Sequence, residues 1–428
     1  MGSAGSIADD ARPDGSLSSI LQKKMQEACD AGAIEAAIND MKEKPEDPNV
    51  QQVSCSFLIS AIEGYDDDEK VLERRKKAKE AKALEPVLQA IHGHPEVSAV
   101  QLQAAMALHQ LLYTEDFPPD GVLKAVTTAL KQSRDTIVIK KHLKILEEFF
   151  CPVDEYWQQF VEEKIFDAFI NIFQNGNEAA IVGVSRQLTP FISYEPKRQE
   201  AAGKSGIAEA ISEALEKHKS FKVLRDVCAL LFYWPGMKGI SEDSRAKIIT
   251  TIAQTGMKHM EIIEKEAAAV DILSGIASVI SYDRDYDEKE SEEVVKNQEI
   301  AFKSGVLDLA LALMEKSEDL LVFDYGGRIF GRICTDEERK DQAMKIKAID
   351  LFAKGMKRAE DDQSEVLEHI TFALMKIAGE NEARIKLLKE AQVTPEQLRK
   401  TENYYGLHQD QQHLEGLENL AKQLEALG

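Results

Sequence analysis

The residue types that perform catalysis or bind metals occur throughout this 428-residue chain, but without the spacing that either task needs. The cysteines are odd in number, lie far apart and form no CxxC pair; they are Cys29, Cys55, Cys151, Cys228 and Cys334. His92 and His94 could hold a metal together, but no cysteine or third ligand lies near them in sequence. We therefore expect no disulfide framework, no zinc site and no bound cofactor.

Motifs of the common enzyme classes are missing as well. The chain contains no P-loop, no GxSxG nucleophile, no HExxH motif, no kinase motif set and no dinucleotide fingerprint. Carboxylates are plentiful, since 75 residues are Asp or Glu, but their spacing singles out no pair for acid–base work. We therefore expect a protein that is not an enzyme.

The net charge and the hydropathy of the chain limit its partners. A net charge of −22 disfavours non-specific binding to nucleic acids and broad adhesion to anionic membranes, because both need a positive surface. No apolar run approaches the ~18 residues of a membrane span, and the N-terminus lacks the regions of a signal peptide. We therefore expect other proteins as partners, with no nucleic acid and no membrane span.

Two short segments bear on the location of the protein. Gly2 and Ser6 fit the myristoylation template, but Asp9 and Asp10 would repel an anionic surface, so we do not expect acylation to anchor the chain. The basic run at 73–77 could be a nuclear localisation signal, although a charged surface helix is the preferred interpretation. We expect a cytoplasmic protein, with the nucleus as the alternative.

The helices that would position a binding surface are visible as an internal repeat. The 31-residue segment from Gly32 matches the segment from Lys82 at an offset of 50 without gaps, and Gln51 coincides with Gln101. Further copies follow at intervals of 39 to 59 residues, and the blocks begin at Gly32, Lys82, Gly121, Lys164, Gly206, Ala246, Gly305 and Lys347. Without charged insertions this spacing is the period of about 40–47 residues that armadillo and HEAT arrays show.

Each block predicts two helices. In the first block, Ile34, Ile38 and Met41 lie at helical spacing, and Pro45 marks the break before a more apolar helix. A shorter charged helix usually precedes the block, and glycines such as Gly121 stand where a sharp turn requires a positive φ. One unit cannot bury its apolar face alone, so stacked neighbours must bury one another. The alternative is an irregular helical bundle, which the phased blocks disfavour.

The pattern resembles the armadillo repeat family. The segments VSCSFLISAI around Cys55, QAAMALHQLL around Met106 and HITFALMKIA around Phe372 are similar to the third helix of that repeat. The resemblance implies an all-α fold, a right-handed α-solenoid of about eight repeats. It also implies that the third helix of each repeat lines a concave face.

The same resemblance predicts the organisation of the chain. We expect a flexible leader over 1–19, a repeat array over 20–380 with charged insertions near 65–82 and 281–296, and capping helices over 381–428. The last stretch carries a leucine stripe that either caps the array or binds a partner helix, with capping preferred: Leu414, Leu417, Leu420 and Leu424.

The residues on the expected concave face differ from those of the family's nuclear-import receptors. Those receptors place Trp and Asn there, whereas this chain has neither, so we do not expect it to hold basic peptides. The candidate partner-binding residues at these positions are Met106, Gln110, Lys144, Arg186, Tyr233, Arg328, Arg332, Phe372 and Lys376. Five of them are cations, and arginine offers a rigid fork for carboxylates and phosphates.

These residues lead to a functional hypothesis. We expect a non-catalytic scaffold or adaptor that holds an extended or helical segment of another protein, either acidic or phosphorylated. The alternative for the cations is that they are solvated charges paired with neighbouring carboxylates. The alternative for the whole chain is a co-chaperone or regulatory subunit that grips a folded client, as some armadillo-type myosin chaperones do.

Overall fold

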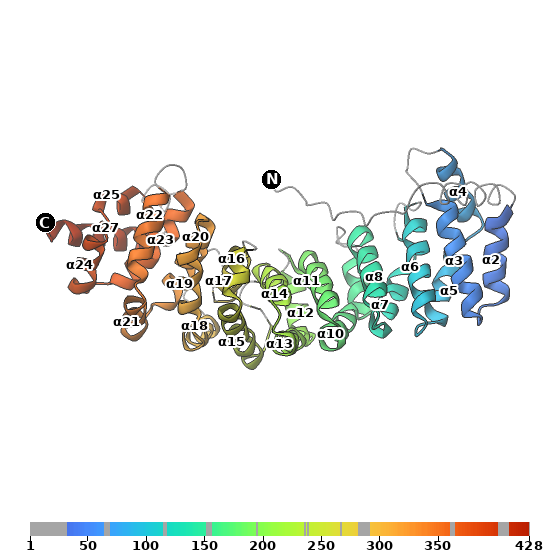
Figure 1. Ribbon diagram of the computed structural model, residues 1–428, viewed down its shortest axis with the longest axis horizontal. Coiled ribbons are helices and arrows are strands. Elements are labelled where there is room, and N and C mark those ends of the chain that lie inside the picture. The colour runs from blue at the N-terminus through green and yellow to red at the C-terminus, as the bar shows by residue number, and fades with distance from the viewer. Residues whose placement is uncertain are drawn as a thin grey trace. The chain divides into compact units, whose positions relative to one another are not determined.

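The computed structural model describes residues 32–63, 69–113, 118–150, 156–193, 196–234, 237, 239–265, 268–280, 292–359, 364–400 and 411–427. This part of the chain is all-α and contains no strand, as the sequence predicted (Figure 1). The predicted leader, Gly2 and most of the predicted acidic insertion lie outside the described residues. No described helix is long and apolar enough to cross a membrane.

Contacts between residues divide the chain into unit 1, Met1–Ala168, and unit 2, Phe169–Gly428. The helices of unit 1 are α2 (Ile34–Glu43), α3 (Pro48–Ile62), α4 (Glu69–Glu80), α5 (Leu84–Gly93), α6 (Ser98–Leu112), α7 (Val122–Gln132), α8 (Thr136–Phe149) and α9 (Trp157–Glu162). Helix α10 (Ile165–Asn175) begins where unit 1 ends.

Unit 2 continues the same succession. Its helices are α11 (Glu178–Ile192), α12 (Pro196–Lys204), α13 (Ile207–His218), α14 (Phe221–Phe232), α15 (Glu242–Lys258), α16 (Met260–Lys265), α17 (Ala269–Ile280), α18 (Glu292–Lys303), α19 (Val306–Lys316), α20 (Leu320–Ile333), α21 (Glu337–Lys345), α22 (Ala348–Arg358), α23 (Ser364–Ala378), α24 (Glu382–Glu390), α25 (Pro395–Lys400) and α27 (Gln411–Ala426).

The more apolar helices form one layer in each unit, and we call them the third helices. In unit 1 these are α3, α6 and α8, and each packs against the next. In unit 2 they are α11, α14, α17, α20 and α23, which also pack in chain order. The amphipathic helices that precede them form a second layer, since α2 packs on α5 and α5 on α7. Apolar residues of both layers are buried between them.

The predicted turns before the amphipathic helices are present. Gly32, Gly121 and Gly206 all have φ of +86° and Gly305 has φ of +80°, a region in which side chains are disfavoured. The corresponding residues of three other blocks are lysines in the same left-handed region: Lys82, Lys164 and Lys347. The block predicted to begin at Ala246 departs from this rule, because Ala246 lies inside the continuous helix α15.

The coincidence of Gln51 with Gln101 has a structural cause. The Gln51 side-chain amide donates to the carbonyls of Met41 and Lys44, 2.9 and 3.0 Å away, at the end of α2. Gln101 donates in the same way to the carbonyls at the end of α5, at 2.7 and 3.0 Å. Both glutamines are buried, so each satisfies carbonyls that a helix end otherwise leaves without partners.

A second set of polar side chains caps the third helices. A residue of the following short helix donates to a carbonyl at or near the C-terminal end of the third helix. The pairs are Arg75 with Ile62, Gln199 with Ile192, Asn297 with Val279, Arg339 with Ile333, and Arg384 with Ile377. These bonds explain why polar side chains such as Arg75, Gln199, Asn297 and Arg384 are buried at the junctions.

The C-terminal leucine stripe packs within the chain. Helix α27 contacts α23, α24 and α25. Leu417, Leu420 and Leu424 are buried and Leu414 is half-buried. The apolar face of α27 is therefore covered by neighbouring helices of unit 2.

Candidate partner-binding surface

The third helices of unit 2 lie side by side and expose one row of side chains each. We call the exposed and half-buried side chains of α11, α14, α17, α20 and α23 the unit 2 surface. Among side chains whose burial the structure describes, its charged members are six cations and two acids: Arg186, Lys222, Arg225, Arg328, Arg332 and Lys376, with Glu178 and Asp271. The other described acids of these helices are buried: Asp226, Asp324 and Glu368. Among the described side chains, cations therefore outnumber acids at the solvent, and three further acids are buried.

Arg186 of α11 and Arg225 of α14 share one buried carboxylate. The Arg186 Nε lies 2.5 Å from Asp226 Oδ1, and the Arg225 Nη2 lies 3.3 Å from Asp226 Oδ2. The Arg186 side chain is 55% exposed whereas that of Asp226 is 7% exposed. Asp271 on the next helix, α17, has a raised pKa. Burial is the main cause and the nearby charge of Asp226 adds to it, whereas Arg225 acts in the opposite direction.

A similar arrangement holds Arg328 on α20. Asp324, one turn earlier, forms an ion pair with Arg328, with Oδ2 3.2 Å from Nη2, and its other oxygen lies 2.6 Å from His369 Nδ1 on α23. The Arg328 guanidinium also lies over Tyr325, 5.1 Å from the ring centroid. These contacts hold the guanidinium in one place while 38% of the Arg328 side chain remains exposed.

Phe372 does not line an exposed wall, contrary to the sequence-based expectation. Its ring is 2% exposed because α23 packs most extensively against α20, where Gly331 has no side chain. A Cβ at Gly331 would collide with the Phe372 ring. The neighbouring cations cover the ring instead, with Arg332 Cζ 5.9 Å and Lys376 Nζ 5.4 Å from its centroid.

The unit 2 surface also carries aromatic rings near its arginines. Tyr233 is half-buried, and its ring meets that of Phe232 edge-on at 5.0 Å. Phe232 of α14 also contacts Tyr325 of α20 at 6.0 Å, although α17 packs between these helices. This contact is possible because α17 exposes small side chains here, such as Ser278. The surface therefore combines aromatic rings with arginines.

In unit 1 the third helices expose a different surface. The exposed and half-buried side chains of α3 and α6 carry no Asp, Glu, Lys or Arg. Met106 is half-buried, and Gln110 accepts a bond of 3.3 Å from Arg75 Nη2. Lys144 of α8 is exposed and lies 3.3 Å from Glu148. The cationic character is thus a property of unit 2 and of α8.

Sequence reasoning missed a cluster at the ends of α6 and α8. Glu148 accepts from the Tyr113 hydroxyl, and its Oε2 lies 2.7 Å from both that oxygen and His109 Nε2. Burial raises the pKa of Glu148, but the bonds from Tyr113 and His109 outweigh it and the pKa falls below its usual range. Phe149 meets both rings edge-on. These residues are 35 to 39 positions apart, so only the block period connects them in sequence.

The structure describes acidic partners for three of the predicted cations. Lys144 pairs with Glu148, Arg186 with Asp226, and Arg328 with Asp324. Arg332 and Lys376 lie over Phe372. The expectation that neighbouring carboxylates pair with these charges therefore holds for the first three.

Of the candidate metal-ligating and nucleophilic side chains, His92 is exposed, whereas His94 and three of the cysteines are buried. His94 Nε2 lies 2.8 Å from the carbonyl of Pro45. Cys55, Cys228 and Cys334 are buried, and burial raises the pKa of the Cys55 thiol to about 12. Within the described ranges, no three His, Cys, Asp or Glu residues are grouped so that they could hold a metal ion.

Comparison with known proteins addresses the fold. No family model matches the chain. No curated protein matches it. Among solved structures, the chain is similar to an engineered protein, with a TM-score of 0.61 and 16% identity over 95% of this chain and 90% of that one. The chain has a helical repeat-like fold. Two further engineered proteins align with TM-scores of only 0.25 and 0.19, at 12% and 18% identity, over 81% and 80% of this chain and 96% and 98% of theirs.

Proposed function

We propose that this chain is a non-catalytic, cytoplasmic scaffold or adaptor that holds an acidic segment of another protein on the unit 2 surface. We further propose that it is a divergent armadillo-like solenoid, right-handed and with about eight repeats, outside the nuclear-import-receptor subclass. The left-handed residues that precede seven of the sequence blocks support this assignment. So does the chain-order packing of the third helices within each unit.

The observation that carries the proposal is the charge of the unit 2 surface. Among the side chains of this surface whose burial is described, six are cations and two are acids, in a chain whose net charge is −22. A surface of this sign attracts acidic segments. Arginine predominates, and its planar fork can bind a carboxylate or a phosphate through two bonds.

The exposure of these cations limits how much each of them can contribute to the affinity for a partner. Exposed ion pairs contribute about 0–1 kcal/mol each, so one cation cannot hold a partner. Several cations on adjacent helices can, and their combined attraction should weaken as salt screens it over a Debye length of about 10 Å at 0.1 M. Binding should therefore be salt-dependent and distributed over several residues.

The experiment is a charge reversal with a matched control. Arg328→Glu combined with Arg332→Glu changes the net charge by four, as does Lys345→Glu combined with Lys354→Glu on the exposed sides of α21 and α22. Both variants are assayed for binding to an array of 15-residue peptides that are acidic, phosphoserine-containing, neutral or basic.

The outcomes separate the readings. We expect the unmodified chain and the control to retain acidic or phosphorylated peptides, and the Arg328/Arg332 variant to lose at least tenfold in affinity. Equal retention of acidic and neutral peptides, or no loss on reversal, contradicts the proposal. Capture of whole folded proteins without any short peptide would favour a co-chaperone that grips a folded client.

A further inference from the structure

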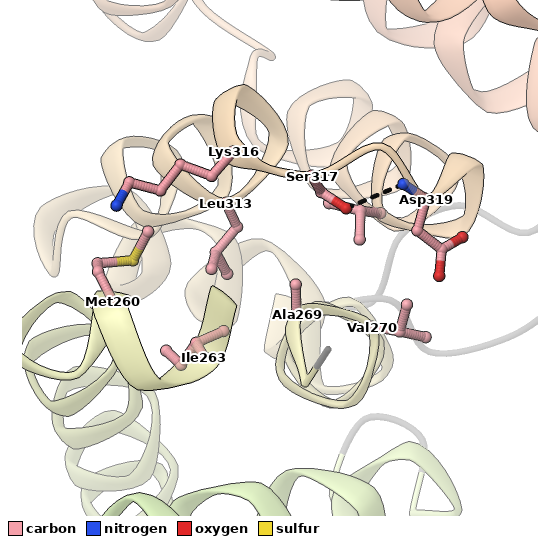
Figure 2. A pocket seen from close by; sticks show the side chains of 9 residues that line it. Met260, Ile263, Ala269, Val270, Leu313, Lys316, Ser317 and Asp319 are labelled. Atoms are coloured by element: carbon pink, nitrogen blue, oxygen red, sulfur yellow. Dashed lines mark hydrogen bonds between the residues drawn. The ribbon is translucent and has the colours of Figure 1, made fainter. Parts of the chain in front are cut away.

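A small cavity lies next to the unit 2 surface. It has a volume of about 60 Å³ and lies among α16, α17, α19 and the start of α20 (Figure 2). Most of its lining is apolar: Met260, Ile263, Ala269, Val270, Leu313 and Val322. Leu313 points from α19 toward Ile263 of α16, and Ala269 of α17 lies on the side of Leu313 opposite Ile263 (Figure 2).

The lining determines what the cavity can hold. A water molecule needs about 10–15 Å³ of such volume and two or more polar partners. Here the volume would take several heavy atoms, but the walls offer few partners for water. Entry of an aliphatic side chain into such a space is favourable, because its apolar surface is removed from water.

The charged residues that line the cavity are Lys316 and Asp319. The Asp319 carboxylate accepts from Leu321 N at 2.9 Å and caps α20, and Asp319 N donates to Ser317 Oγ at 3.1 Å. Asp319 is therefore engaged within the chain. Lys316 is the cation among the lining residues, and its side chain is exposed. The lining thus carries one charge of each sign, and the preference for an acidic segment comes from the arginines of α20.

The cavity and the arginines of the unit 2 surface share helix α20. Val322 lines the cavity, Arg328 lies six residues later and Arg332 ten residues later on the same helix. With a rise of about 1.5 Å per residue, these spacings correspond to about 9 and 15 Å. An extended peptide covers that length in about three to five residues. One segment could therefore reach the cavity and the arginines together.

The apolar surroundings support an interface at this place. Leu321, at the start of α20, is 49% exposed, Ile262 of α16 is 40% exposed, and Met257 at the end of α15 is 46% exposed. A pocket for one anchor residue within apolar neighbours and a charged rim is the usual arrangement of a binding hot spot.

We propose that this cavity takes one leucine-sized side chain of the acidic segment, three to five residues from the carboxylates or phosphates that Arg328 and Arg332 bind. This inference rests on the proposed function and specifies its ligand. The partner's motif would be an aliphatic anchor and an acidic pair at that spacing.

The test uses a fluorescein-labelled dodecapeptide of glycine and serine with one leucine and, three to five residues away, two glutamates, in both sequence directions. Its partner probe has alanine in place of leucine. Fluorescence anisotropy with the full chain should show about tenfold tighter binding of the leucine peptide, since ~1.4 kcal/mol of apolar burial corresponds to a factor of ten. Equal affinities for the two peptides overturn the inference.

The location is tested by filling the cavity. Val270→Phe places a ring at a half-buried lining position, and Val295→Phe makes the same change on α18 at a side chain that is 45% exposed. Val270→Phe should remove the preference for leucine, and Val295→Phe should keep it. A preference that survives Val270→Phe overturns the inference.

A second readout does not depend on how the variant folds. In the unmodified chain with ¹³C-methyl methionines, the Met260 signal, identified with Met260→Leu, should shift on addition of the leucine peptide. An unmoved Met260 signal at saturation overturns the inference. A different result would contradict the proposed function itself: in that case, Arg328→Glu combined with Arg332→Glu leaves the affinity for both peptides unchanged.

Discussion

Replacing Gly121 by alanine should destabilise unit 1, whereas the same replacement at Gly93 should stabilise it. Gly121 precedes α7 with φ of +86°. A Cβ built there would meet its nearest neighbour, a methyl group of Leu88, at an ordinary 3.8 Å, so the backbone conformation and not space opposes the change. Gly93 ends α5 without a positive φ, and a Cβ there would meet nothing within 4 Å.

The magnitudes follow from two opposing effects. The left-handed conformation costs a residue with a Cβ about 1–2 kcal/mol. Alanine also restricts the unfolded chain, which returns about 0.4–1 kcal/mol. Gly121→Ala should therefore lower the free energy of unfolding by about 0–1.6 kcal/mol, centred near ~0.8 kcal/mol. Gly93→Ala should raise it by about 0.4–1 kcal/mol.

The assay is urea and thermal unfolding of the full chain, followed by circular dichroism. A difference of about 1 kcal/mol corresponds to about 2–4 °C for a unit of this size, so the two variants should differ by roughly 5 °C. Lys164→Gly, at φ of +54°, is the reverse change and should not destabilise. A Gly121→Ala variant as stable as Gly93→Ala would refute the reasoning.

Three further changes test the packing and the buried polar groups. Gln101→Met removes the bonds to the end of α5 and should lower the free energy of unfolding by about 1–3 kcal/mol; a change below measurement error in urea unfolding contradicts this role. Gly331→Ala would push a methyl group into the Phe372 ring and should cost about 1–3 kcal/mol, with an unchanged midpoint as the opposing result. Burial lowers the pKa of His142 to about 4, against the usual ~6.5, so the unfolded chain binds protons more readily between these values. Stability from this residue is then present above pH ~6.5 and is lost as the pH falls toward 4, by about 2 kcal/mol at pH 5. His142→Leu should flatten the pH dependence by that amount, and an unaltered slope would contradict the assignment.

Local features that repeat at one offset were predictable from the sequence. The apolar faces, the turn glycines and the match of Gln51 with Gln101 each occupy a fixed place within a block. The same turn conformation at Lys164 was not predictable, because a lysine gives no local signal for positive φ. Packing of the adjoining helices overrides the preference of the residue there. The continuous helix α15 could have been predicted, because its sequence has no residue that breaks a helix at Ala246 and Ser241 provides an N-cap.

The burial of side chains on the unit 2 surface could not be predicted from one helix alone, because it depends on residues of the neighbouring helix. Phe372 occupies a position that faces solvent in a regular repeat, and Gly327 and Gly331 on α20 allow α23 to approach closely enough to cover it. A large aromatic residue in one block opposite a glycine in the preceding block is the sequence signal that could have shown this. The pairing of Arg186 with Asp226 likewise spans 40 residues and two helices.

Pairing with a carboxylate and binding of a partner are compatible for these arginines. A guanidinium has five N–H donors, and Arg186 is joined to Asp226 through Nε while Arg328 is joined to Asp324 through one Nη. The buried acids fix the guanidinium groups in position, which reduces the side-chain entropy that a partner would otherwise have to remove. If either acid were replaced by its amide, the arginine would keep its charge but lose this restraint. Asp324→Asn should therefore slow association little and speed dissociation of an acidic peptide, whereas Arg328→Glu should lower the association rate itself.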